Sequence, residues 1–352
     1  MKVVLAPDSW SGFRSANRVA AEAAERWDFV DELVQLPMTD GGQDATLALK
    51  ELSSGVLSLE VDAPLEDDRV TALALRLRQG GCFLESARVL GRALCEDPSR
   101  AGSQGLGQAL RQLERQDGLL IVGLGGSGTM DGGLGLAHGL GLHLSGLQGL
   151  PGAAQLGRVQ ALHGRAPLQD RLVAVWADVE TPLLDSARVF GPQKGADELF
   201  IERNTRELEH WAGLVNAWRV RQGRAPLPLD LPRGGAAGGL AWALAALLDA
   251  HLLPGARAAG RALGLDDALR GADVLVTGEG RFDATSLQGK VVGHVLDRAR
   301  ALGVQRRVVL CGSRDPQVQP EGVEILSCDE LFGDSREMRY QSALDQLATT
   351  LF

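Results

Sequence analysis

Residues 119–133 read Leu119-Leu120-Ile121-Val122-Gly123-Leu124-Gly125-Gly126-Ser127-Gly128-Thr129-Met130-Asp131-Gly132-Gly133. Leu119–Val122 predicts a short buried strand, which enters a glycine-rich loop ahead of a helical stretch. A strand that leads through a loop into a helix is the unit of α/β folds. Glycines let backbone N–H groups face an anion, and the start of a helix adds a favourable field. The stretch therefore predicts an α/β fold with an anion-binding loop.

Several side chains of this loop add to the prediction. Ser127 and Thr129 supply hydroxyl donors beside the backbone of Gly125 and Gly126, so these four residues are candidate phosphate ligands. Asp131 could hold a metal ion or accept a hydrogen bond from a substrate hydroxyl. A tight turn with a purely structural role is the alternative.

The loop also fits two other nucleotide motifs incompletely. Gly123, Gly125 and Gly128 form GxGxxG, but no Asp or Glu occurs between Asp131 and Asp170 to bind a ribose, which disfavours a nicotinamide dinucleotide. The Walker A pattern GxxxxGK[ST] is absent, so the chain is not an ordinary P-loop enzyme.

The chain ends repeat the strand–loop–helix pattern. Residues 2–6 predict a strand, and 15–27 a helix capped by Ser15. Residues 273–277 and 290–302 predict a strand and a helix near the other end. The two ends are therefore expected to join in one doubly wound domain. Short stretches of alternating apolar and polar residues in 55–85 predict antiparallel strands in a second, middle domain.

Composition narrows the function. A length of 352 residues favours two domains, and a net charge of −9 without a long Lys/Arg run argues against nucleic acid. Four cysteines without CxxC spacing fit a reducing cytoplasm. The longest apolar stretch, 234–248, is too short to span a bilayer and predicts a buried helix, so no membrane partner is expected.

A second group of candidates follows the strand at 273–277. Glu279, Arg281 and Asp283 are expected on a loop past the end of that strand, where open α/β sheets bind ligands. Paired carboxylates there suit a divalent metal or a general base. A surface salt-bridge cluster is the alternative.

Lysine is rare in this chain and one lysine lies in a stiff turn. Only four of the 36 basic residues are lysines, and Lys194 is placed in the turn 190–196 after Pro192. A lysine so placed can neutralise phosphate. Two acidic turns, at Asp8-Ser9 and at Asp40-Gly41-Gly42, each close a short strand, although each could be an ordinary turn.

Taken together, these motifs resemble the type I bacterial glycerate kinase family, and their order matches from end to end. The matching segments are Ala6-Pro7-Asp8-Ser9, Asp40-Gly41-Gly42, Gly125-Gly126-Ser127 with Asp131-Gly132-Gly133, Asp178-Val179 with Pro182-Leu183, Phe190–Ala196, Gly235–Gly239, Thr277–Arg281 with Asp283, and Gln288-Gly289-Lys290. These ordered motifs, spread over nearly the whole chain, are together far more specific than any one of them.

The resemblance implies a fold and an activity. It implies a Rossmann-like parallel-sheet domain built from both chain ends, 1–54 and 265–352, with a smaller inserted α/β domain, 55–264. It implies ATP-dependent phosphorylation of D-glycerate, usually to 2-phosphoglycerate, with Mg²⁺ as cofactor. The expected partner is thus a small hydroxy acid, and the sequence is compatible with a homodimer.

The implied roles fall on matching residues. Asp40, Lys194, Arg281 and Asp283 are the expected catalytic group, with Asp40 or Asp283 orienting the attacking hydroxyl. Asp178 and Asp283 are the expected metal ligands. The expected substrate and ATP ligands are Asp8, Ser9, Gly125, Gly126, Ser127, Thr129, Asp131, Glu279 and Lys290.

Three positions depart from the family pattern. Ser11 replaces a lysine, Gln43 follows the DGG turn where the family has glutamate, and Met130 replaces an asparagine. These positions are expected to face the cleft. Two alternatives therefore stay open: a kinase for another small hydroxy acid, and a non-catalytic descendant that binds a ligand.

Overall fold

The structure is a computed structural model that describes the 352-residue chain except residues 11, 28–29, 66–67, 169, 332 and 351–352. The chain forms two compact units. Unit 1 comprises Met1–Asp40, Leu47–Leu52 and Gly255–Phe352, and unit 2 comprises Gly41–Thr46 and Ser53–Pro254. The inserted unit is the larger of the two, so the expectation of a smaller insert is wrong.

Unit 1 is built on a five-stranded sheet in which every neighbouring pair is parallel. The order is β13-β12-β11-β1-β2, so the first and last thirds of the chain share one sheet. The strands are β1 (Lys2–Pro7), β2 (Glu32–Gln35), β11 (Val274–Phe282), β12 (Arg306–Arg314) and β13 (Glu324–Ser327). This order, with β1 in the interior, is that of a doubly wound fold.

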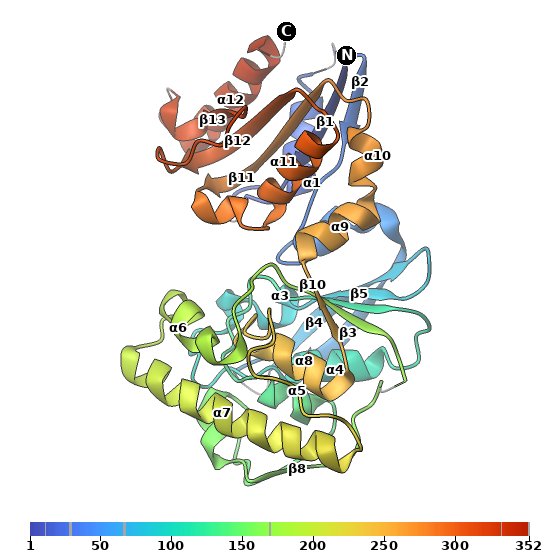
Figure 1. Cartoon of the computed structure of the whole chain (residues 1–352), viewed down its shortest axis with the longest axis vertical. Helices are drawn as coiled ribbons and strands as arrows, with labels where there is room; N and C mark the ends of the chain where they lie inside the picture. The colour runs from blue at the N-terminus through green and yellow to red at the C-terminus, as the bar shows by residue number, and fades with distance from the viewer. Residues whose placement is uncertain (11, 28–29, 66–67, 169, 332, 351–352) are drawn as a thin grey trace. The chain divides into compact units, whose positions relative to one another are not determined.

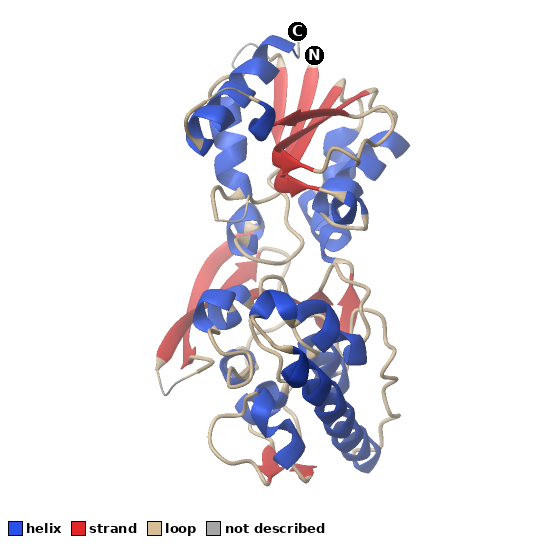
Figure 2. Ribbon diagram, turned by 90° about the vertical axis from the view of Figure 1, so that its left-hand side faces the viewer, coloured by secondary structure: helices blue, strands red, loops and turns tan. Residues whose placement is uncertain are grey.

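Helices cover both faces of this sheet (Figure 2). They are α1 (Ala16–Ala24), α9 (Gly255–Leu263), α10 (Leu265–Leu269), α11 (Val291–Ala301) and α12 (Arg336–Thr350). Alternate residues of one strand point to opposite faces, so Val3 joins the core beneath α1 and α12, whereas Val4 joins the core beneath α10 and α11. Two separate apolar cores therefore hold the unit 1 sheet.

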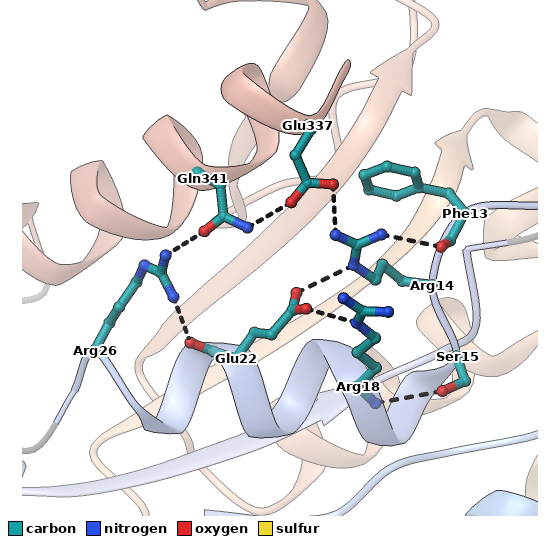
Figure 3. Close-up of polar contacts among 8 residues, drawn as sticks. All are labelled: Phe13, Arg14, Ser15, Arg18, Glu22, Arg26, Glu337 and Gln341. Carbon is teal, nitrogen blue, oxygen red and sulfur yellow. Dashed lines mark hydrogen bonds and ion pairs between the residues drawn. The ribbon is translucent and has the colours of Figure 1, made fainter. Parts of the chain in front are cut away.

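Polar contacts connect the first and last helices of unit 1 (Figure 3). Ser15 caps α1 as predicted, since its hydroxyl accepts a hydrogen bond from the Arg18 N–H. Arg14 donates to Glu22 on α1, at 3.2 Å, and to Glu337 on α12. The Arg14 guanidinium also stacks on the Phe13 ring at 4.4 Å. These contacts fix the segment that leads from β1 into α1.

Unit 2 contains a mixed six-stranded sheet in the order β10-β9-β6-β5-β4-β3. The strands are β3 (Ser53–Asp62), β4 (Arg69–Leu77), β5 (Cys82–Glu85), β6 (Leu120–Gly123), β9 (Val173–Trp176) and β10 (His251–Leu253). β3, β4 and β5 are antiparallel, which confirms the prediction for 55–85. β5, β6, β9 and β10 are parallel, so their carboxyl ends share one edge.

The remaining elements of unit 2 pack on this sheet and on a two-stranded ribbon (Figure 1). The ribbon is β7 (His143–Ser145) with β8 (Ala161–His163), and the helices are α3 (Ala87–Leu90), α4 (Gln104–Gln112), α5 (Leu134–Gly139), α6 (Ser186–Phe190), α7 (Glu198–Arg221) and α8 (Leu240–Leu248). A short helix, α2 (Ala45–Ala48), spans the boundary of the two units. Every residue of α8 is buried, as predicted for the apolar stretch. Within the described residues, no helix is both long and apolar enough to cross a membrane.

Candidate functional site

The glycine-rich loop of unit 2 begins at the carboxyl end of β6. Its amides at Gly125, Gly126 and Ser127 have no acceptor among the described residues, although Ser127 is buried. Gly126 has a φ of +74°, in the left-handed region that favours glycine. Successive backbone N–H groups that face outward from a left-handed glycine turn can bind an anion, so these three consecutive amides indicate a place for one.

Neighbouring contacts hold this loop in place. The Gly128 N–H donates to the Leu90 carbonyl at 2.7 Å. The hydroxyl oxygens of Ser127 and Thr129 lie 3.0 Å apart in a hydrogen bond, and the Thr129 N–H donates to the Ser127 hydroxyl at 3.3 Å. The two hydroxyls therefore bond to each other and shape the loop.

Lys194 lies against the same loop. It belongs to a single 3₁₀ turn, Pro192–Lys194, and its ammonium donates to the Thr129 carbonyl at 2.7 Å. Burial lowers the pKa of Lys194 to about 8. The turn that was predicted to carry a phosphate-binding lysine thus brings that charge to the glycine-rich loop within unit 2.

Asp131 has a different place from the one expected. It is fully buried, and its carboxylate accepts hydrogen bonds from the Ser103 N–H and hydroxyl at 2.8 and 2.7 Å, the Gly135 N–H at 2.9 Å and the Gly133 N–H at 3.2 Å. Burial raises its pKa, while these bonds oppose the rise. With its oxygens so occupied, Asp131 fixes the start of α5 and is not disposed to hold a metal or a substrate hydroxyl.

The DGG turn packs onto the start of the glycine-rich loop. A Cβ on Gly123 would lie 2.0 Å from the Gly41 carbonyl oxygen, and a Cβ on Gly41 would lie 3.0 Å from Cβ of Trp176. Only glycine permits this approach. Sequence reasoning took the two glycine motifs separately, and the structure brings Gly41 and Gly123 together in unit 2.

Glu85 was missed by the sequence analysis. It ends β5, is 1% exposed, and its carboxylate accepts bonds from the Asp44 N–H at 3.0 Å and from the Thr46 N–H and hydroxyl at 2.9 and 2.8 Å. Glu85 therefore anchors the segment that follows the DGG turn. The available signal was an acidic residue at the carboxyl end of a buried strand.

Asp178 lies at the same edge of the unit 2 sheet. It follows β9, which is parallel to β6 with Trp176 opposite Gly123. The Leu124 N–H donates to the Trp176 carbonyl at 3.1 Å, which joins the two strand ends. Asp178 is partly buried two residues further along. It thus belongs to the neighbourhood of the glycine-rich loop.

In unit 1, Asp8 and Ser9 follow the end of β1. The Asp8 N–H donates to the Gly278 carbonyl at 2.8 Å, and the Asp8 carboxylate accepts from the Ser9 N–H at 2.7 Å. Pro7 pairs with Gly278 across β1 and β11, so this turn lies beside the residue that precedes Glu279.

Glu279 has the most perturbed carboxyl of this region. Burial raises its pKa to about 7, and the carboxylates of Asp283 and Asp40 add to the rise, whereas Ser286 and Lys290 oppose it. Its Oε1 is buried and has no hydrogen-bond partner among the described residues. A strongly perturbed carboxyl with an oxygen that lacks a hydrogen-bond partner among the described residues is typical of a functional site.

The residues after Glu279 differ from the expected loop. β11 continues to Phe282, with Arg281 opposite Ser313 of β12, so Glu279 and Arg281 lie on a strand. Pairing with β12 explains the extension, because it supplies partners that local sequence does not reveal. Arg281 is exposed and lies 3.5 Å from Asp283.

Asp283 caps the short helix that follows β11. Its carboxylate accepts from the Thr285 N–H at 2.9 Å and the Thr285 hydroxyl at 2.7 Å, and these bonds lower its pKa. Lys290 donates to the same hydroxyl at 2.9 Å. The structure therefore gathers Asp8, Ser9, Glu279, Arg281, Asp283 and Lys290 at one edge of the unit 1 sheet.

The donor set can be tested against a magnesium ion. Among the described residues, no three His, Cys, Asp or Glu side chains converge as a ready-made metal centre. Mg²⁺ typically takes one or two carboxylates beside substrate phosphates and water, so a full protein cage is not required. The unpartnered Oε1 of Glu279, next to Asp283, fits such a partial site.

Two of the three departing positions can be placed. Met130 is fully buried in the core of unit 2, so the expectation that its side chain faces a cleft is wrong. Gln43 is exposed. Ser11 lies outside the described residues.

Comparisons with known proteins agree with this arrangement. The profile of the Glycerate kinase family matches residues 3–350. Glycerate 2-kinase of Escherichia coli is 34% identical over 83% of this chain and 80% of its own length. Glycerate kinase of Haemophilus influenzae is 34% identical over 82% and 80%.

A solved structure is similar over its full length. The crystal structure named as glycerate kinase 2 of Salmonella typhimurium LT2 has a TM-score of 0.79 and 30% identity, and covers 100% of this chain and 98% of its own. The predicted two-domain α/β class is confirmed. The chain belongs to the glycerate kinase family and is an enzyme that phosphorylates glycerate.

Proposed function

We propose that the chain transfers the γ-phosphoryl group of ATP to the 2-hydroxyl of D-glycerate in the presence of Mg²⁺, giving 2-phosphoglycerate. The observation that carries this proposal is the set of three amides, Gly125 to Ser127, that have no acceptor among the described residues and lie beside the partly buried ammonium of Lys194. The name Glycerate 2-kinase of the Escherichia coli relative supports the choice of hydroxyl.

The unit 2 residues are assigned to phosphate. Phosphoryl transfer needs positioning and charge neutralisation more than covalent chemistry. The amides would donate to phosphate oxygens from a loop that other contacts already hold, so little reorganisation is needed when charge develops. Lys194, whose pKa is lowered by burial, would regain its full charge beside a phosphate, because an anion favours the ammonium.

The unit 1 residues are assigned to the metal and the acceptor. Bound Mg²⁺ would neutralise charge on the phosphate oxygens, and Glu279 with Asp283 would hold it. Asp178 is a candidate metal ligand within unit 2, beside the glycine-rich loop. Asp40 or Asp283 would orient the attacking hydroxyl and accept its proton at a carboxylate oxygen. Arg281, which is exposed, would bind the glycerate carboxylate, and Asp8, Ser9 and Lys290 would complete substrate and ATP binding.

A coupled assay of ADP release tests this proposal. We expect ADP formation that requires ATP, Mg²⁺ and D-glycerate together, with L-glycerate, lactate and tartrate turned over more slowly. ³¹P NMR of the product distinguishes the 2-phosphate from the 3-phosphate. Faster turnover of another hydroxy acid would replace glycerate as the substrate. Absence of turnover with every acid would leave a ligand-binding descendant.

A further inference from the structure

A cavity in unit 1 is lined by none of the residues assigned above. It has a volume of about 430 Å³ and lies between α9, α10 and the face of α11 that carries His294 and Arg298. This volume is in the range of small-molecule sites. Its basic side chains are Arg257 and Arg261 of α9, one turn apart, with His294 and Arg298, one turn apart on α11.

Two of these cations have no counter-charge among the described residues. Arg298 forms a two-bond pair with Asp266, at 2.8 Å for each bond, and Asp267 pairs with Arg270. Arg257 and Arg261 have no hydrogen bond or ion pair with any described residue. The acids around the cavity are thus already engaged, and two guanidinium groups remain uncompensated.

His294 lies among these cations. A Cβ on Gly260 would lie 3.1 Å from the His294 Nε2, so glycine keeps the α9 backbone open beside the imidazole. Burial lowers the pKa of His294, and Arg298 and Arg257 lower it further, against the opposing effect of Asp266 and Asp297. The pKa of this imidazole should therefore respond to any charge that enters the cavity.

We propose that the cavity between α9 and α11 is a second ligand site, which binds a small dianion of the phosphate class through Arg257 and Arg261. Guanidinium forks bind phosphate through paired, charge-assisted hydrogen bonds. A dianion also relieves the repulsion among the four basic groups. The cavity has room for an organic phosphate as well as for inorganic phosphate.

The proposal predicts how binding of the dianion depends on pH. The charged groups that face His294 are Arg257 and Arg261 from α9, Asp266 and Asp267 from α10, and Arg298 and Asp297 from α11. A bound dianion favours the imidazolium, so it raises the pKa of His294. By linkage, the affinity for the dianion strengthens as pH falls through that pKa, when it is compared at equal concentrations of the dianion, because phosphate itself takes up a proton in the same range.

The test is an NMR titration of the whole protein with ¹³C-labelled histidine. The chain has six histidines, and a His294→Gln variant assigns the His294 signal. At constant ionic strength, inorganic phosphate should raise the pKa of His294 by about one unit with a Kd near or below about 1 mM. A parallel titration with glycerol 2-phosphate distinguishes the source: tighter binding assigns an organic phosphate, and equal binding assigns inorganic phosphate.

Variants separate this site from general charge effects. The double variant Arg257→Gln with Arg261→Gln should raise the Kd for phosphate at least about tenfold, which corresponds to about 1.4 kcal/mol of binding free energy. Its turnover without added phosphate should be unchanged. Arg300→Gln, on α11 but outside the cavity lining, is the matched control and should bind as wild type. An unmoved His294 pKa, or an equal shift in the double variant, would overturn the proposal.

Discussion

Replacing Lys194 tests the assignment of the glycine-rich loop to phosphate. The Lys194 ammonium donates at 2.7 Å to the Thr129 carbonyl, so its charge is held on the loop itself. Losing one donor where charge develops costs about 2–4 kcal/mol, which is roughly 30- to 1,000-fold in rate. We expect Lys194→Ala to lower kcat/KM for ATP at least about tenfold. Lys194→Arg should retain only part of the wild-type kcat/KM for ATP, because the larger, planar guanidinium group replaces a compact ammonium.

The same change should leave stability nearly unaltered, because two effects oppose each other. The Lys194 pKa is about 8 in the folded chain against 10.5 ordinarily. This depressed pKa means that charged Lys194 costs about 3 kcal/mol below pH 8, and the cost disappears as pH rises from 8 to 10.5. Alanine removes that cost but leaves the buried Thr129 carbonyl without its donor, which costs about 1–3 kcal/mol.

Steady-state kinetics and thermal melting at pH 7 check both expectations. Lys50→Ala is the matched control, because Lys50 is an exposed lysine outside the proposed site. Wild-type kinetics in both Lys194 variants would place Lys194 outside the phosphate site. A large fall in Tm for Lys194→Ala would show that its role is structural.

Three further changes probe the other assignments. Glu279→Gln should remove the fall of kcat/KM on the acid side of pH 7. The raised pKa of Glu279 makes the stability of the wild type fall as pH rises from 4.5 to about 7, so the Tm of the variant should exceed that of wild type at pH 8 but not at pH 4.5. Calorimetry that finds the same Tm difference at both pH values would contradict this. Asp131→Ala should destabilise unit 2 in urea unfolding by about 1–3 kcal/mol for each buried donor that loses its acceptor. Unchanged stability with lost activity would restore Asp131 as a ligand. Gly123→Ala should destabilise strongly through its clash with Gly41, while Gly126→Ala should cost about 1 kcal/mol from its positive φ alone; equal melting temperatures would refute the packing argument.

Local pattern predicted the parts of the fold that depend on neighbours in sequence. Ser15 was predicted as a helix cap and serves as one, and the strand at 119–122 was predicted within one residue of β6. The end of β11 could not be predicted, since Glu279 and Arg281 are held in a strand by pairing with β12. Residue type alone did not reveal that pairing.

The candidate site, like the fold, could be predicted only where local sequence decides the outcome. Short glycine motifs indicated where an anion could bind, but burial decides what each nearby acid does. Asp131 is surrounded by donors from Ser103 and from its own loop, whereas Glu279 keeps an oxygen without a partner. Both acids lie in glycine-rich sequence, so only the packing of distant segments separates a structural carboxylate from a candidate functional one.

The unpaired amides of the glycine-rich loop depend on that structural carboxylate. The N–H groups at Gly125 to Ser127 face no acceptor in the described part of the chain, and such a loop would collapse onto its own carbonyls unless other contacts held it. The Gly128 N–H bonded to Leu90, the Lys194 ammonium on the Thr129 carbonyl, and Asp131 at the start of α5 supply those contacts from three directions. The cost of ordering the loop is then met during folding and not during catalysis, which is the condition under which fixed donors stabilise a transition state.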